Sequence, residues 1–92
     1  MSFFDDPLFS IRHHGGKIII NETVTVPEAD LGNFIDLMCS RVKNSFTELT
    51  DKRVISMMKD DTRITLTSYR SGVIAETTQI PRSCLSEFLA TL

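Results

Sequence analysis

Residues 8–26, LFSIRHHGGKIIINETVTV, contain two runs of alternating side chains on either side of Gly15-Gly16. Two adjacent glycines suit a two-residue hairpin turn, because both turn positions need a positive φ. Such a turn fixes the register of strands at 8–14 and 17–26 and sets Ile11 opposite Ile20. One face of the predicted hairpin is apolar and carries Phe9, Ile11, Ile18, Ile20, Val24 and Val26. We expect that face to be covered by the rest of the protein.

The next stretch, residues 27–49, is predicted to form one long helix. Pro27 suits the first helical turn, and the acidic Glu28 and Asp30 suit the positive end of the helix dipole. Apolar residues recur at the spacing of a single helical face, namely Leu31, Phe34, Ile35, Met38, Val42, Phe46 and Leu49. We expect this stripe to pack against a sheet.

The rest of the chain is predicted to hold three strands and a short helix, at residues 53–59, 62–69, 73–80 and 82–92. The order ββαβββα predicts an α+β fold. Its antiparallel sheet carries the long amphipathic helix on one face, and the short helix ends the chain. We expect residues 1–92 to form a single compact domain, with 1–7 as a candidate flexible tail. We identify no internal repeat in the sequence.

The turn between the last two strands leaves two alternatives. A three-residue loop places Ile74 and Ile80 on the covered face of the sheet, whereas a two-residue loop places Ala75 and Thr77 there. We favour the three-residue loop because it buries more apolar area. It also places the acidic Glu76 on the covered face, which counts against it.

The composition is that of an ordinary globular protein of 92 residues, 41% hydrophobic and 24% charged. With 10 basic and 12 acidic residues the net charge is -2, which disfavours broad DNA binding. No stretch approaches the roughly 18 apolar residues of a membrane span, and the acidic amino terminus lacks a signal-peptide layout. We therefore expect a cytoplasmic protein in which Cys39 and Cys84 are reduced and serve as small buried apolar residues.

No residue pattern predicts catalysis, a cofactor or a metal site. His13 and His14 are adjacent, but neighbours in a strand point to opposite faces and do not easily chelate one ion. Lys17 follows two glycines, yet a strand follows where a phosphate-binding loop needs a helix. We therefore expect a protein that is not an enzyme and that acts by binding.

Candidate binding residues lie on polar strand faces and in one turn. The first hairpin contributes a basic cluster, Arg12, His14 and Lys17. The strand at 62–69 contributes the polar face made of Arg63, Thr65, Thr67 and Tyr69. If the two hairpins share a sheet, these residues form one open face that could meet a phosphate backbone or an acidic protein surface. Asp60 and Asp61 form an acidic turn. The alternative is an ordinary solvated strand face with ordinary turn chemistry.

The whole chain resembles small phage-encoded anti-CRISPR proteins that inhibit type I-F surveillance complexes. The resemblance runs from residues 2–7 (SFFDDP) through 12–17 (RHHGGK) to 84–88 (CLSEF), and it lies in length and overall sequence rather than in one motif. It implies a non-catalytic protein that occupies an RNA-guided effector and blocks pairing of target DNA with the guide. The implied partners are effector protein subunits, with guide RNA as a further contact, and neither a membrane nor a small-molecule substrate.

The resemblance transfers no functional residue by motif, so roles are assigned from charge. The acidic residues expected to face cationic effector surfaces are Asp5, Asp6, Asp60 and Asp61. Arg12, Lys17 and Arg63 are alternatively expected to approach guide phosphates. The competing function is a small nucleic-acid-binding regulator that uses the polar and basic sheet face, against which the pI of about 5.6 weighs.

Overall fold

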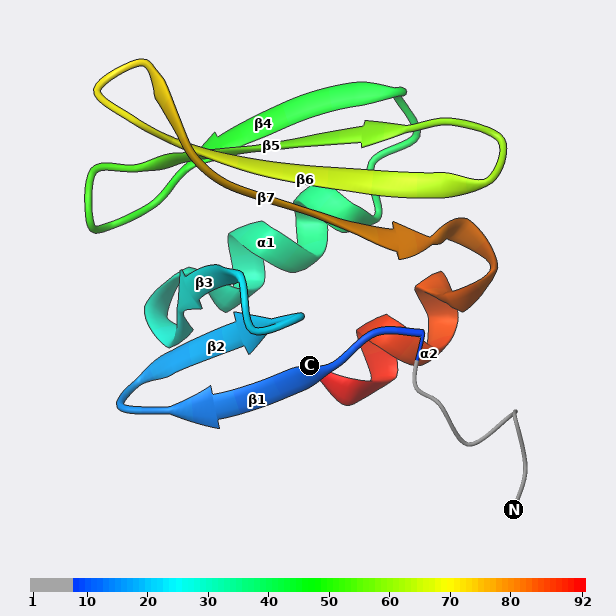
Figure 1. The fold of residues 1–92 in the computed structure, drawn as a ribbon, viewed down its shortest axis with the longest axis horizontal. Helices are drawn as coiled ribbons and strands as arrows, with labels where there is room; N and C mark the ends of the chain where they lie inside the picture. The colour runs from blue at the N-terminus through cyan, green and yellow to red at the C-terminus, as the bar shows by residue number, and fades with distance from the viewer. Residues whose placement is uncertain (1–7) are drawn as a thin grey trace.

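The computed structural model describes residues 8–92 and has the expected α+β class, with antiparallel strands in two sheets (Figure 1). The first part of the chain holds β1 (Ile11–His14), β2 (Lys17–Ile20), β3 (Val24–Pro27), the 3₁₀ turn η2 (Glu28–Asp30) and helix α1 (Leu31–Met38). The second part holds β4 (Asn44–Glu48), β5 (Val54–Lys59), β6 (Arg63–Arg70), β7 (Val73–Pro81), the 3₁₀ turn η3 (Arg82–Cys84) and helix α2 (Leu85–Thr91). The strand orders are β1-β2-β3 and β4-β5-β6-β7.

The predicted first hairpin is confirmed, with Ile11 opposite Ile20 and positive φ at both glycines of the turn. The run predicted as one strand at 17–26 is instead two strands. Asn21 and Glu22 adopt φ of 52° and 54°, and the Thr23 N–H donates to the Ile20 carbonyl at 2.9 Å. This tight turn folds β3 back on β2. The apolar face is buried as expected, since Ile18, Ile20, Val24 and Val26 belong to the core.

The helix predicted over 27–49 is wrong in its second half. The helix α1 ends at Met38, and Asn44–Glu48 form the strand β4, which pairs with β5. Asn, Ser, Phe and Thr in this stretch are weak helix formers, so strand hydrogen bonds with β5 decide the conformation. Phe46 therefore does not join the buried helical stripe, and its side chain is 68% exposed.

The β6–β7 connection combines features of both predicted alternatives. Arg70 pairs with Val73, so the loop has two residues, and the register shifts beyond Tyr69. The shift leaves Ala75 as an extra residue, so that Ile80 faces the core while Ile74 pairs with Tyr69 and is exposed. The prediction that Ile74 is covered is therefore wrong, and the prediction for Ile80 is confirmed.

The structure contains a repeated unit, so the expectation of no internal repeat is wrong. Residues 26–34 and 80–88 share the pattern (V/I)-P-x-x-x-L-x-x-F. Each forms the end of a strand, a 3₁₀ turn and the start of a helix. Pro27 has φ -59° and ψ 139°, and Pro81 has φ -58° and ψ 132°. Proline suits both sites because its fixed φ is already that of the turn entry and no N–H is needed there.

The hairpins that precede these segments are also equivalent. The residue after each proline donates its N–H to a carbonyl in the hairpin turn, Glu28 to Gly16 and Arg82 to Thr62, each at 3.0 Å. We call β1 to α1 the first unit and β5 to α2 the second unit. The strand β4 has no counterpart among the described residues of the first unit.

The two units pack crosswise around one core. Phe34 and Phe88 occupy equivalent positions in the repeat, and their rings meet edge to face at 6.2 Å. Phe88 also meets Phe9, which precedes β1, at 5.5 Å, while α1 contacts β4 of the four-stranded sheet. Figure 1 shows α1, α2 and the three-stranded sheet on the same side of the four-stranded sheet. The opposite side of that sheet carries no helix or strand of the described chain.

Alanine substitutions test which aromatic rings hold the core. Phe34→Ala and Phe88→Ala should each lower the free energy of unfolding by about 3–5 kcal/mol, because both rings are fully buried. Phe46→Ala should change it by no more than about 0.5 kcal/mol because the ring is exposed. Urea unfolding followed by circular dichroism measures all three. A Phe46→Ala loss as large as that of Phe34→Ala would contradict the strand assignment of β4.

Candidate interaction surface

The side of the four-stranded sheet that faces away from the helices forms the candidate site. Alternation along the strands places on it one cross-strand row of Met58, Thr65 and Gln79 and another of Ser56, Thr67 and Thr77. We call this side the outer face. Three of its apolar side chains are largely exposed, Phe46, Met58 (57%) and Ile74 (61%). Large apolar groups grouped on an open sheet face are typical of an interaction surface.

Polar contacts hold the centre of the outer face in one arrangement. The hydroxyls of Thr67 and Thr77 lie 3.3 Å apart on neighbouring strands. The Arg63 guanidinium donates from Nη1 to Oε1 of Gln79 at 3.0 Å, and Gln79 donates from Nε2 to the Thr65 hydroxyl at 3.4 Å. The structure thus brings Arg63, Thr65 and Thr67 together on one face, with Tyr69 further along the same strand.

The basic cluster of the first hairpin lies elsewhere. Arg12, His14 and Lys17 are exposed, but β1 and β2 belong to the three-stranded sheet. The two hairpins therefore do not share a sheet, and the single open face that depended on this condition does not form. The Arg12 guanidinium makes two hydrogen bonds of 2.9 Å to the Glu22 carboxylate. The side-chain hydrogen bond from Arg12 lowers the pKa of Glu22, so the two charges neutralise each other over the ordinary pH range.

The acidic turn at Asp60 has a clear local role. Its Oδ1 accepts from the backbone N–H groups of Thr62 at 2.8 Å and of Arg63 at 2.9 Å. These backbone hydrogen bonds lower the pKa of Asp60. The carboxylate therefore closes the β5–β6 turn, which is the ordinary turn chemistry of the alternative interpretation. Asp61 is exposed beside it. Asp5 and Asp6 lie outside the described residues.

The sequence interpretation missed the apolar part of the site. Of the adjacent Met57 and Met58, only Met57 is buried, and Met58 is 57% exposed. Met58, Phe46 and Ser56 help to line a groove of about 400 Å³ at the β4 side of the outer face, whose other lining residues are Asn44, Ser45 and Met57. Adjacent strand residues point to opposite faces, so the Met57-Met58 pair already signals one exposed methionine.

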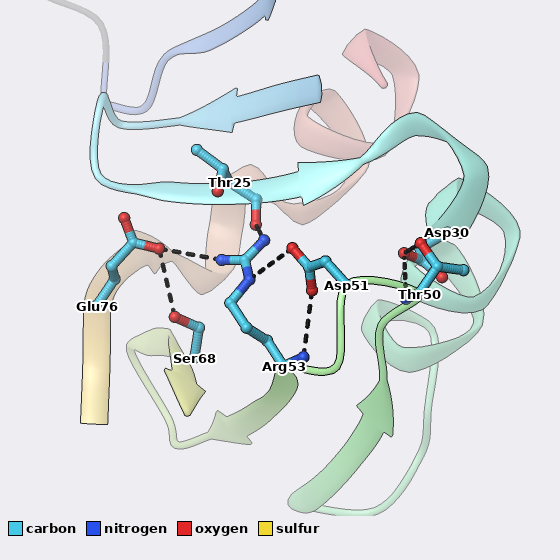
Figure 2. A network of polar contacts seen from close by, with 7 residues as sticks. All are labelled: Thr25, Asp30, Thr50, Asp51, Arg53, Ser68 and Glu76. Atoms are coloured by element: carbon cyan, nitrogen blue, oxygen red, sulfur yellow. Dashed lines mark hydrogen bonds and ion pairs between the residues drawn. The ribbon is translucent and has the colours of Figure 1, made fainter. Parts of the chain in front are cut away.

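A buried arginine holds the sheet that carries the outer face against the first unit (Figure 2). The Arg53 side chain is only 5% exposed. Its guanidinium donates to Oδ2 of Asp51 at 2.8 Å, to the carbonyl of Thr25 at 2.8 Å and to Oε1 of Glu76 at 3.2 Å. Figure 2 shows it between β3 on one side and β7 on the other. The contact with Arg53 explains how the acidic Glu76 can lie on the covered face of the sheet.

A buried carboxylate, that of Asp30, fixes the position of β4. Asp30, which precedes α1, accepts at Oδ2 from the Thr50 N–H at 2.9 Å and from the Thr50 hydroxyl at 3.0 Å. Thr50 follows β4 closely in the chain, so this contact ties the start of α1 to the end of that strand.

Cys84 occupies the position equivalent to Asp30 and is buried, whereas Cys39 is exposed, contrary to expectation. Both are free thiols.

Within residues 8–92, no group of three or more histidine, cysteine, aspartate or glutamate side chains is placed to hold a metal ion. None of the helices described is long and apolar enough to cross a membrane. Comparisons with protein-family models, with curated proteins and with solved structures gave no match to this chain.

Replacing the buried arginine tests its structural role. Arg53→Met should lower the free energy of unfolding by about 2–4 kcal/mol, because it leaves two partly buried carboxylates and a strand carbonyl without their donor. The matched control is Arg12→Met, which removes a surface pair whose side chains are 50% and 58% exposed and should leave stability nearly unchanged. Thermal and urea unfolding compare the two. Equal losses would show that the Arg53 network does not hold the units together.

The Asp51 carboxylate gives this network a pH dependence. Burial raises its pKa, but the hydrogen bonds from Arg53 and the charge of Arg53 outweigh burial, so the pKa is lowered overall. A carboxylate with a lowered folded pKa stabilises the protein above its unfolded pKa, about 3.9, and this stabilisation is lost as pH falls through the folded value. The difference in unfolding free energy between wild type and Asp51→Asn should therefore be constant near pH 7 and shrink below about pH 4. A difference that stays constant down to about pH 2.5, measured by urea unfolding, would contradict it.

Proposed function

We propose that this protein is a non-catalytic, stoichiometric inhibitor that binds a bacterial type I CRISPR RNA-guided effector and blocks recognition of target DNA. Its contact surface is the outer face of the four-stranded sheet. The observation that carries this proposal is the exposure of Phe46, Met58 and Ile74 on a face that no described helix or strand covers.

The chemistry of the outer face favours a protein partner. Interface centres are enriched in aromatic residues and methionine and depleted in charge. The outer face follows that composition, with Phe46, Met58 and Tyr69 among threonine hydroxyls and with Arg63 held by Gln79. Desolvating threonines that already bond each other costs less than desolvating free charges. The face is therefore suited to burial against another protein.

The choice of effector rests on the sequence resemblance to type I-F inhibitors. Such effectors hold the guide and target along a positively charged channel. A protein of net charge -2 is attracted to that channel, and Asp60, Asp61 and Glu48 supply negative charge at the borders of the outer face. In this proposal the protein acts in the cytoplasm of the bacterial host, uses no cofactor and inhibits by occupying space.

A second candidate is a nucleic-acid-binding regulator. One observation favours it: Phe46 and Tyr69 lie on an open sheet face, where aromatic rings can stack on unpaired bases, and Arg63 can meet a phosphate. The acidic composition weighs against it, because most of the affinity of such proteins comes from several phosphate contacts.

A competition experiment tests the inhibitor proposal. Purified type I-F effector is mixed with excess full-length protein, and binding of labelled target DNA is measured by gel shift. We expect DNA binding to be lost. Met58→Asp should weaken inhibition at least about tenfold, because it places a charge within a desolvated contact. The matched control Ala29→Asp adds the same charge at an exposed position of η2 and should inhibit as wild type does.

Two outcomes oppose the inhibitor proposal in different ways. Normal DNA binding by the effector in excess protein contradicts inhibition. Direct binding of the protein alone to single-stranded DNA or RNA, weakening steeply with salt, supports the regulator instead. Fluorescence anisotropy with labelled oligonucleotides at two salt concentrations measures the second outcome.

A further inference from the structure

The edge strands of the two sheets differ in how their free edges are protected. Unprotected edges pair readily with other strands, so proteins cover, bend or charge them. The strand β3 ends at Pro27, and its Thr25 carbonyl accepts a hydrogen bond from Arg53. The edge of β7 has a register shift, and its Gln79 carbonyl accepts from Asn21. The strand β1 is short, with four residues, and three of its side chains are exposed, including the charged Arg12.

The strand β4 has one exposed charged residue, Glu48, and none of the other protections. Its five residues, NSFTE, contain no proline, lysine or register shift. No hydrogen bond from any residue in 8–92 reaches its outward edge. Phe46 at its centre is exposed. A regular edge with an exposed aromatic ring is a template for a further strand.

The backbone groups of β4 show which residues would pair. Leu49 donates its N–H to the Arg53 carbonyl, and Lys59 donates to the Lys43 carbonyl, both at 2.8 Å. In an antiparallel ladder this pattern alternates, so odd-numbered residues of β4 bond to β5. The even-numbered residues, Asn44, Phe46 and Glu48, therefore direct their N–H and C=O groups away from the sheet.

We infer that β4 pairs antiparallel with β4 of a second copy of this chain, about a twofold axis at Phe46. The three outward-directed residues are spaced symmetrically about Phe46, so this axis satisfies all of their backbone groups in both copies. Phe46 lies opposite Phe46 of the second copy, and Asn44 lies opposite Glu48. An amide opposite a carboxylate forms a hydrogen bond, and no like charges face each other.

This pairing extends the sheet rather than covering it. Paired residues in an antiparallel ladder point to the same side, so the two outer faces join into one continuous surface. The interface is short, because β4 has five residues. We therefore expect a weak dimer whose population rises with concentration, at the small end of specific interfaces. The dimer requires neither the effector nor a nucleic acid, so it is independent of the proposed function.

Sedimentation velocity of the full chain over a range of concentrations tests the dimer. The buffer contains a reductant, because Cys39 is exposed and could form a disulfide with a second copy. We expect the 10.4 kDa chain to shift toward twice its mass as concentration rises to about 1 mM. Phe46→Lys should abolish the shift by placing two like charges opposite each other. Thr77→Lys adds the same charge in the same cross-strand row but on β7, and should leave the shift unchanged.

A charge exchange tests the register. Asn44→Glu places a second carboxylate opposite Glu48 twice per dimer and should weaken dimerisation roughly two- to thirtyfold. Adding Glu48→Lys to that variant restores opposite charges and should restore the dimer. Circular dichroism of each variant confirms that it is folded.

Three results would overturn this inference. The first is a chain that stays monomeric at every concentration. The second is equal weakening by Phe46→Lys and Thr77→Lys, which would place the contact on the outer face rather than at the edge. The third is a double variant as weak as Asn44→Glu alone, which would exclude this register.

Discussion

The placement of the two sheets depends on the buried guanidinium of Arg53. A buried charge without partners is far more costly than a buried apolar group, so the chain must supply acceptors on every side. Thr25 supplies one acceptor from the three-stranded sheet. Asp51 supplies another from the segment before β5, and Glu76 supplies the third from β7. A buried ion pair contributes little net stability compared with an apolar pair of similar size. A shifted register, however, would leave the Arg53 guanidinium buried without its acceptors, which is costly. We interpret the network as fixing which arrangement of the sheets forms.

The repeated unit explains how a short chain builds a shared core. A strand, a proline, a 3₁₀ turn and a short helix recur with nearly the same dihedral angles at Pro27 and Pro81. Neither helix alone is long enough to bury a sheet. Because the units pack crosswise, Phe34 and Phe88 cover each other, and each unit completes the core of the other. The extra strand β4 breaks this symmetry and widens only the second sheet, which is where the candidate surface lies.

Local signals in the sequence predicted the parts of the fold that local physics decides. The Gly15-Gly16 turn led to the correct register because both positions need positive φ. The helix at 27–49 was extended too far because Phe46 fits a helical stripe and a strand alternation equally well over so few residues. Pairing with β5 decides between them, and pairing is a tertiary contact. The bulge at Ala75 and the partner of Glu76 are likewise set by contacts between distant segments.

The exposed apolar side chains of the outer face are not required by the fold. An antiparallel sheet with one covered side normally places polar residues on the other, and the threonines and Gln79 follow that rule. Phe46 and Met58 do not follow it. Both side chains lie largely in water, and apolar area left in water contributes nothing to folding. Their presence on a broad face that the described chain leaves uncovered is therefore better explained by a contact outside the chain than by its own stability.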